Sequence, residues 1–201
     1  MQIKRTPWGA PQFVKERGPG VVFVSTAGHG GIKLDRAKNA QIHAAWRRKG
    51  GWYEEDVDWA IVAVTLGAAA GFDADAVKDA HRTLKDYFPG AYETVYGVSV
   101  GPEESSVVRE REARKMVAGR PLMGSCFGDW SVNVPKGRVG ICVQLDNGAE
   151  AYYTISLEQH QNAGVVVAGH RTRVRPLPED AIPVDGSKGC PFGVGAKESA
   201  A

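Results

Sequence analysis

The chain has 201 residues, of which 43% are hydrophobic and 24% are charged, and its formal net charge is +2. These values are ordinary for a globular protein, and they exclude an acidic mimic of DNA and a strongly basic coat for nucleic acid. The three cysteines form no Cys-x-x-Cys pair, which argues against a structural zinc site or a disulfide framework and fits a reducing cytoplasm. No apolar run approaches the roughly 18 residues that a membrane-spanning helix requires, so we expect a cytoplasmic protein with no membrane partner.

The first regular element that the sequence predicts is a β-hairpin over residues 20–34. The apolar run at 21–24 suits a pleated, half-buried strand, and an alternating pattern resumes at 32–34 after Gly-His-Gly-Gly. Glycine supplies the positive-φ conformations that a tight reversal needs. We therefore expect His29 at the tip of the hairpin with open space around its ring. The simpler alternative is a polar turn whose histidine only faces solvent.

Two helices are expected after the hairpin. The first covers residues 36–49, with Asp35 as its N-cap and four alanines favouring the helix. The second covers residues 51–66, and its first turn carries acidic residues that complement the positive end of the helix dipole. A buried strand over 60–66 is the alternative, because several of these residues are β-branched.

The next segment is expected to hold two more helices and a short strand. Residues 73–88 have the spacing of an amphipathic helix that Pro89-Gly90 ends. Residues 94–100 are expected to form a short strand. The charged residues 102–119 are expected to form a solvated helix.

The pattern changes after residue 120, where four segments are expected to be strands. The strongest hairpin signal is Asp146-Asn147-Gly148, whose residues tolerate the φ > 0 pair of a type I′ turn. From residue 176 onward, prolines and glycines predict an extended or disordered tail. The four expected strands are 122–130, 138–145, 149–157 and 165–174.

These elements predict an α+β protein in three parts. The N-terminal part (1–120) has a β-hairpin plus helices. The C-terminal part (121–175) is a small antiparallel β-sheet or half-barrel. The remaining residues (176–201) are the Pro/Gly-rich tail.

Several short motifs occur in a fixed order along the chain, and by them it resembles a bacterial domain-of-unknown-function family, number seven-thousand-seven. The resemblance covers residues 7 to about 170. It implies a setting in phages, plasmids and proteobacterial genomes, but it brings no activity, cofactor or catalytic residue. The motifs are Pro7-Trp8-Gly9, the hairpin with its core Ser-Thr-Ala-Gly-His-Gly-Gly-Ile, Trp52-Tyr53-Glu54-Glu55-Asp56 before Ala60-Ile61-Val62, Phe88-Pro89-Gly90-Ala91-Tyr92-Glu93, Gly128-Asp129-Trp130, and Val134-Pro135-Lys136-Gly137-Arg138-Val139-Gly140.

The first candidate site joins His29 to Glu54, Glu55 or Asp56. A histidine with carboxylates can bind a divalent metal or carry out general acid–base chemistry. Sequence spacing alone does not force these residues together, so a glycine turn and an acid-rich helix start remain the plainer interpretation.

A second candidate is the segment 97–101, Gly-Val-Ser-Val-Gly, which matches the nucleophile elbow of esterases. The elbow needs a buried strand before Ser99 and a helix of small residues after it. The strand expected here is short, and Pro102-Glu103-Glu104 follows, so the context argues against an elbow.

A basic surface is the third candidate. If residues 165–174 form one strand, Arg171, Arg173 and Arg175 share a face, because side chains alternate along a strand. Beside Arg138, they would form a surface that contacts phosphate or nucleic acid. A solvated outer face is the alternative.

The sequence thus favours an accessory protein of a phage or other mobile element. It would bind a host or element macromolecule, either protein or nucleic acid, and counter-defence is one role that such binding could serve. The alternatives are a hydrolase that uses His29 with the nearby carboxylates and a component of a virion. No cofactor is expected.

Overall fold

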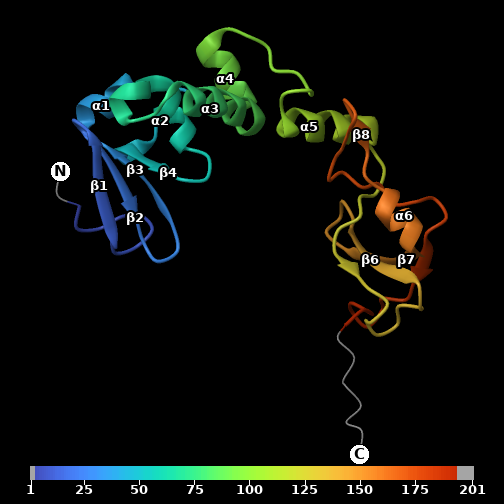
Figure 1. Ribbon diagram of the computed structural model, residues 1–201. Coiled ribbons are helices and arrows are strands. Elements are labelled where there is room, and N and C mark those ends of the chain that lie inside the picture. Colours follow the sequence, from blue (N-terminus) through green and yellow to red (C-terminus); the bar gives the residue numbers. More distant parts are fainter. Residues whose placement is uncertain (1–2, 194–201) are drawn as a thin grey trace, which may run out of the picture. The chain divides into compact units, whose positions relative to one another are not determined.

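The computed structural model describes residues 3–193, and Figure 1 shows its helices and strands in chain order. The chain divides into two compact units, Met1–Val108 and Arg109–Ala201. Among residues 3–193, no helix is long and apolar enough to cross a membrane.

The N-terminal unit is built on a four-stranded antiparallel sheet with the strand order β1-β2-β3-β4. The expected hairpin is confirmed as β2 and β3, in which Val24 faces Gly31 and Ser25 faces Gly30. The strands are β1 (Phe13–Gly18), β2 (Val21–Ser25), β3 (Gly30–Leu34) and β4 (Trp52–Glu54).

Helix α1 (Arg36–Gln41) begins where the sequence predicted. The Asp35 side chain caps it by accepting from Lys38 N at 2.7 Å. The expected end at residue 49 is wrong, because Ile42 is fully buried in an extended conformation. Burial of this one side chain outweighs the helix propensity of the alanines that follow it. A short 3₁₀ turn, η1 (Lys49–Gly51), then leads into β4.

The helix predicted over 51–66 is wrong in its first half. Residues 52–54 form β4, which pairs with β3, and α2 (Trp59–Leu66) begins only at Trp59. The three acidic residues 54–56 therefore lie at the end of a strand and in the following turn, outside the helix. The alternative of a buried strand over 60–66 is also excluded.

Three more helical segments complete the N-terminal unit. The helix expected over residues 73–88 is confirmed as α3 (Ala74–Tyr87), and Asp73 caps it by accepting from Ala76 N at 2.8 Å. Between α2 and α3 lies a short 3₁₀ segment, η2 (Gly67–Ala70). The strand expected at 94–100 is wrong: α4 (Pro89–Tyr96) occupies that region, and Pro89 starts a helix where it was expected only to stop one. Proline suits the first turn of a helix, where its missing N–H has no partner to lose.

The core of this unit lies between the sheet and the helices. Tyr53 of β4 is fully buried, and its hydroxyl donates to Asn39 Oδ1 at 2.7 Å while accepting from Arg48 N at 3.2 Å. This pair of hydrogen bonds ties β4 to the segment after α1. Other fully or almost fully buried side chains of the cluster are Val21, Ile32, Leu34, Ile42, Ile61, Val62 and Leu84.

The C-terminal unit contains an open antiparallel sheet with the order β10-β7-β6-β5, so the half-barrel alternative is not adopted. A separate two-stranded hairpin forms from β8 and β9. The elements are β5 (Cys126–Phe127), β6 (Arg138–Gln144), β7 (Glu150–Ser156), α6 (Leu157–Asn162), β8 (Val166–Val167), β9 (His170–Arg171) and β10 (Ile182–Val184). Helix α5 (Ser106–Met116) spans the boundary between the two units.

The hairpin between β6 and β7 is confirmed, but its turn differs from the expected type. Leu145 N donates to Ala149 O at 2.8 Å, so the loop has three residues, 146–148. Gly148 has φ +80, whereas Asn147 is not among the residues with positive φ. A three-residue loop ending in a left-handed glycine is the second common way to close a hairpin.

The strands expected at 122–130 and 165–174 are much shorter than predicted. The first pairs at β5 and at one isolated bridge between Leu122 and Pro176, and the second pairs with itself as β8 and β9. The expected tail also contains ordered structure up to residue 193. Strand β10 pairs with β7, and the buried Phe192 packs against Tyr152 and Phe127. Residues 194–201 of the expected tail lie outside the described residues.

Candidate functional site

His29 lies in the turn that joins β2 to β3, and Thr26 holds its backbone. Thr26 N and Thr26 Oγ1 each donate to His29 O at 2.7 Å, and Thr26 Oγ1 accepts from His29 N at 3.2 Å. A threonine hydroxyl that bonds to nearby backbone groups closes a turn locally. The direction in which the His29 side chain leaves the backbone is therefore set by its own turn.

Both ring nitrogens of His29 face carboxylates. Nε2 lies 3.0 Å from Glu54 Oε1, and Nδ1 lies 3.4 Å from Glu55 Oε1. The ring of Trp8 stands edge-on to the imidazole, with the centroids 5.9 Å apart. The His29 side chain is 35% exposed, so the ring is held on three sides and still reaches solvent.

Pairing of β4 with β3 brings the carboxylates to His29. Glu54 faces Gly31 across the two strands, and Glu55 N donates to Gly30 O at 3.1 Å. The Glu54 carboxylate is fixed in turn, because Oε1 accepts from Asp56 N at 2.7 Å and Oε2 accepts from Val57 N at 3.3 Å. The acids thus take part in a turn and in contacts with His29, and they do not serve as helix-dipole partners.

The glycines of this hairpin are needed for space, which differs from the reason expected from the sequence. Gly28, Gly30 and Gly31 are not among the residues with positive φ. A Cβ atom on Gly30 would lie 2.4 Å from Glu55 Oε2, and one on Gly31 would lie 2.3 Å from both the Trp8 ring and Tyr53 O. Glycine at 30 and 31 therefore lets Glu55, Trp8 and β4 approach the strand that carries His29.

Three side chains of this cluster can reach a common ion. One ligand atom from each of His29, Glu54 and Asp56 lies within 4.8 Å of the other two. Asp56 is exposed, whereas His29 and Glu54 are half-buried. The four residues that the sequence singled out thus lie close together, and we refer to His29, Glu54, Glu55 and Asp56 as the His29 cluster.

A surface pocket of about 200 Å³ adjoins the His29 cluster, with Glu55 and Gly31 in its wall. The rest of the lining is largely aromatic: Phe23, Trp59 and Phe72 contribute, and the Trp59 and Phe72 rings lie 5.8 Å apart. The guanidinium carbon of Arg17 lies 5.0 Å from the centroid of the Phe72 ring. Sequence analysis missed these lining residues, because they come from β1, β2, α2 and the segment before α3.

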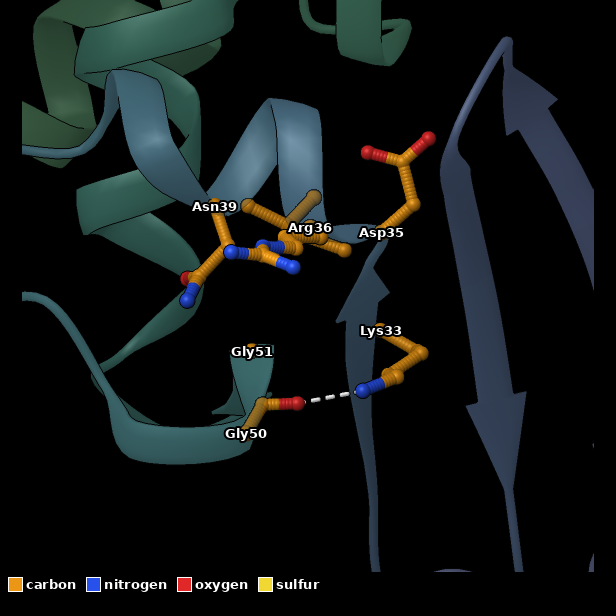
Figure 2. Close-up of a pocket in the computed structure, with 7 residues that line it drawn as sticks. Lys33, Asp35, Arg36, Asn39, Gly50 and Gly51 are labelled. Atoms are coloured by element: carbon orange, nitrogen blue, oxygen red, sulfur yellow. Dashed lines mark hydrogen bonds between the residues drawn. The ribbon is translucent and has the colours of Figure 1, made fainter.

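A larger pocket of about 450 Å³ lies at the start of α1 (Figure 2). Figure 2 shows the Lys33 side chain reaching across to Gly50, to whose carbonyl oxygen it donates a hydrogen bond. Burial lowers the pKa of Lys33, and its ammonium lies 5.0 Å from the centroid of the Trp52 ring. The lysine therefore joins β3 to η1 across the pocket.

The nucleophile elbow that the sequence suggested is not formed. Helix α4 precedes Ser99, and Gly97 is the left-handed C-cap of that helix. An elbow requires a strand before the serine and a helix after it. Ser99 is exposed on the connection between α4 and α5.

The arginines predicted to form one basic face do not lie on one strand. Strand β9 ends at Arg171. The backbone N–H of Arg173 donates to Glu110 Oε1 at 2.6 Å. Arg138 donates to the side chain and the carbonyl of Thr154, at 3.1 and 2.8 Å. Arg175 lies 3.3 Å from His160, whose pKa is lowered first by burial and then by this arginine.

Trp8 contacts His29 directly, and the sequence did not predict this contact. Its ring contacts both His29 and Trp52, with centroids 5.9 and 5.6 Å apart. A large aromatic residue in a polar, proline-rich segment indicates that the segment packs against the body of the protein, because the ring has to be removed from water. The residues near Trp8 in the sequence do not indicate which side chains its ring contacts.

Comparison with known proteins identifies a family for the N-terminal unit. The family model described as Domain of unknown function (DUF7007) matches residues 1–118. The match ends well before residue 170, so the motifs at 128–130 and 134–140 lie outside it. No curated protein and no solved structure matches the chain. With more than half of its length matched by the family model, the chain belongs to the DUF7007 family.

Proposed function

We propose that the N-terminal unit is a hydrolase and that the His29 cluster activates its water molecule. The observation that supports this proposal is the placement of carboxylates at both ring nitrogens of His29. Such an arrangement fixes the orientation of the ring, so that the imidazole can act on a water molecule as a base or as the ligand of an ion that holds the water. A solvated surface histidine needs neither the fixed Glu54 carboxylate nor two glycines that make room for its neighbours.

The reaction requires a place for the substrate beside the activated water. The pocket next to Glu55 offers aromatic walls and one cationic group, Arg17. Clefts with mostly apolar walls and a few polar groups are the usual form of small-molecule sites. We therefore place the apolar part of the substrate against Phe72 and Trp59, with its scissile bond toward Glu55.

The test is a hydrolysis screen with the full chain. The panel consists of p-nitrophenyl acetate, p-nitrophenyl phosphate, bis-p-nitrophenyl phosphate and p-nitrophenyl glycosides. We expect turnover of at least one class, and we expect His29→Gln to reduce kcat by at least about 100-fold, the scale of a lost acid–base group. The matched control is His170→Gln, which changes an exposed histidine of the other unit. Equal turnover by the two variants would refute the proposal.

A second candidate is an accessory protein of a phage or other mobile element, acting in the bacterial cytoplasm by binding a host or element macromolecule, with counter-defence as its purpose. The exposed outer edge of the N-terminal sheet supports it. Residues 13–17 of β1 are all exposed, and Phe13 and Val14 are 53% and 44% exposed. Apolar side chains on an edge strand favour pairing with another chain.

Edge pairing is testable with Val14→Lys, since an edge lysine blocks strand addition. Capture of one defined host or element macromolecule by the wild-type chain, and its loss in Val14→Lys, would support the accessory role. Concentration-dependent self-assembly would instead favour the virion component. Capture that survives the substitution would argue against the β1 edge as the binding surface.

A further inference from the structure

We propose that the His29 cluster binds one divalent transition-metal ion through Nε2 of His29 and carboxylate oxygens of Glu54 and Asp56. One ligand atom from each of the three residues lies within 4.8 Å of the other two, and Nε2 is the ring nitrogen that faces Glu54. This inference deepens the proposed hydrolase and rests on it for the role of the ion, although binding of the ion can be measured without any substrate.

The spacing of the first two ligands fits one ion. Nε2 of His29 and Oε1 of Glu54 are 3.0 Å apart. For an ion about 2.1 Å from each atom, the N–metal–O angle would be about 90°, which is the angle between adjacent ligands of an octahedral ion. Asp56 is exposed, so its carboxylate can rotate toward the ion.

Neighbouring groups orient both of these ligands before an ion arrives. The NH groups of Asp56 and Val57 fix the Glu54 carboxylate, while each oxygen keeps a free lone pair. Glu55 Oε1 lies against Nδ1 of His29. A carboxylate that accepts from one ring nitrogen holds the histidine in the form whose other nitrogen can bind a metal.

The donor set selects the kind of ion. One imidazole nitrogen with two carboxylates suits Mn²⁺, Fe²⁺, Co²⁺ or Zn²⁺, whereas Mg²⁺ and Ca²⁺ favour oxygen ligands alone. Three protein ligands leave coordination positions for water, as in catalytic metal sites. A bound ion of this kind lowers the pKa of its water and so supplies the nucleophile for hydrolysis.

The test measures Mn²⁺ binding to the full chain by the loss of the electron paramagnetic resonance signal of free Mn²⁺. Mn²⁺ is the probe because the free cysteines favour softer metals. We expect one ion per chain and at least tenfold weaker binding in His29→Gln and in Asp56→Asn. Glu55→Gln should weaken binding about 10–100-fold, as loss of a carboxylate behind a metal-binding histidine does. Asp75→Asn, an exposed acid in the first turn of α3, should bind as the wild type does.

A second readout reports the nitrogen ligand. The visible absorption bands of bound Co²⁺ should change in His29→Gln and stay unchanged in Asp75→Asn. Circular dichroism shows whether each variant is folded, and the exposed Asp56 provides a variant that leaves the core intact.

The two proposals fail in different ways. Absence of Mn²⁺ binding at millimolar concentration, or binding that is undiminished in both His29→Gln and Asp56→Asn, overturns the metal site. Turnover that persists in excess chelator overturns the role of the ion in the reaction and leaves the hydrolase standing. Mn²⁺ binding with the expected losses, but without turnover of any substrate, supports the metal site and counts against the hydrolase.

Discussion

Substitution of Gly31 by alanine tests how closely the elements of the site approach one another. The added Cβ would lie 2.3 Å from the Trp8 ring and 2.3 Å from the carbonyl oxygen of Tyr53. A backbone oxygen of a paired strand cannot move aside by changing a rotamer, so β4 or β3 has to shift. Overpacking of this kind costs about 1–3 kcal/mol. The lower entropy of the unfolded alanine chain offsets only about 0.4–1 kcal/mol.

We therefore expect Gly31→Ala to lower the free energy of unfolding of the N-terminal unit by about 1–2 kcal/mol. For a unit of about 100 residues, this corresponds to a fall in Tm of about 4–15 °C. Urea denaturation followed by tryptophan fluorescence is the assay, because Trp8, Trp46, Trp52 and Trp59 all lie in this unit and only Trp130 lies in the other.

Gly28→Ala is the matched control in the same turn. No atom lies within 4 Å of its added Cβ, and Gly28 does not have positive φ. Its stability should equal or exceed that of the wild type by up to about 1 kcal/mol, because the added Cβ meets no atom and alanine lowers the entropy of the unfolded chain. If Gly31→Ala were as stable as Gly28→Ala, the close approach of Trp8 and β4 to β3 would be refuted.

Three further predictions follow from particular contacts. Gly30→Ala should keep the fold but reduce turnover at least about tenfold. Its Cβ comes closest to the flexible end of Glu55, at 2.4 Å, and lies 3.0 Å from the backbone oxygen of Val24, so the Glu55 carboxylate has to move away from His29; initial rates at matched folded fraction check this. Phe192→Ala should destabilise the C-terminal unit by about 3 kcal/mol, measured by its thermal midpoint, since the ring is only 4% exposed; an unchanged midpoint would mean that the segment after β10 contributes nothing. Burial, and after it the charge of Lys85, lowers the pKa of His81, so the unfolded chain binds more protons than the folded one near and below pH 6.5. The free energy of unfolding of the N-terminal unit should therefore fall as the pH drops through that region. Urea titrations at about pH 5 and about pH 8 measure this fall, and His81→Gln should remove the part of it that comes from His81.

The parts of the fold that sequence predicted well are those encoded by local signals. The amphipathic spacing of residues 73–88 was enough for α3. Alternating apolar residues and a glycine-rich turn were enough for the hairpin of β2 and β3. In both cases the residues that decide the structure lie within a few positions of each other.

Prediction failed where a distant partner decides the conformation. Residues 52–54 form a strand because they pair with the edge of β3. The helix α2 begins a few residues later, so the sequence alone also fitted a helix that included residues 52–54. The segment from residue 176 was expected to be extended or disordered, but within it Phe192 packs against Tyr152. Local propensity carries no information about such contacts.

The composition of the candidate site was accessible from sequence, whereas its construction was not. His29 was selected because it is a reactive residue type in a glycine-rich turn, and the acids at 54–56 were selected because they form a run of carboxylates. The pairing register that sets Glu54 opposite Gly31 and the Trp8 ring beside His29 arise from tertiary structure. The glycines were correctly noticed, but their role is to leave room, which only the neighbouring side chains reveal.

The most direct measurement of the central claim is a double-mutant cycle on turnover with His29→Gln, Glu54→Gln and the double variant. Groups that activate one water molecule together act as a unit, so losing the second member costs little once the first is gone. We predict that the double variant is no more than about threefold slower than the slower single variant. Losses that multiply, so that the two free energies add fully, would contradict joint action of His29 and Glu54.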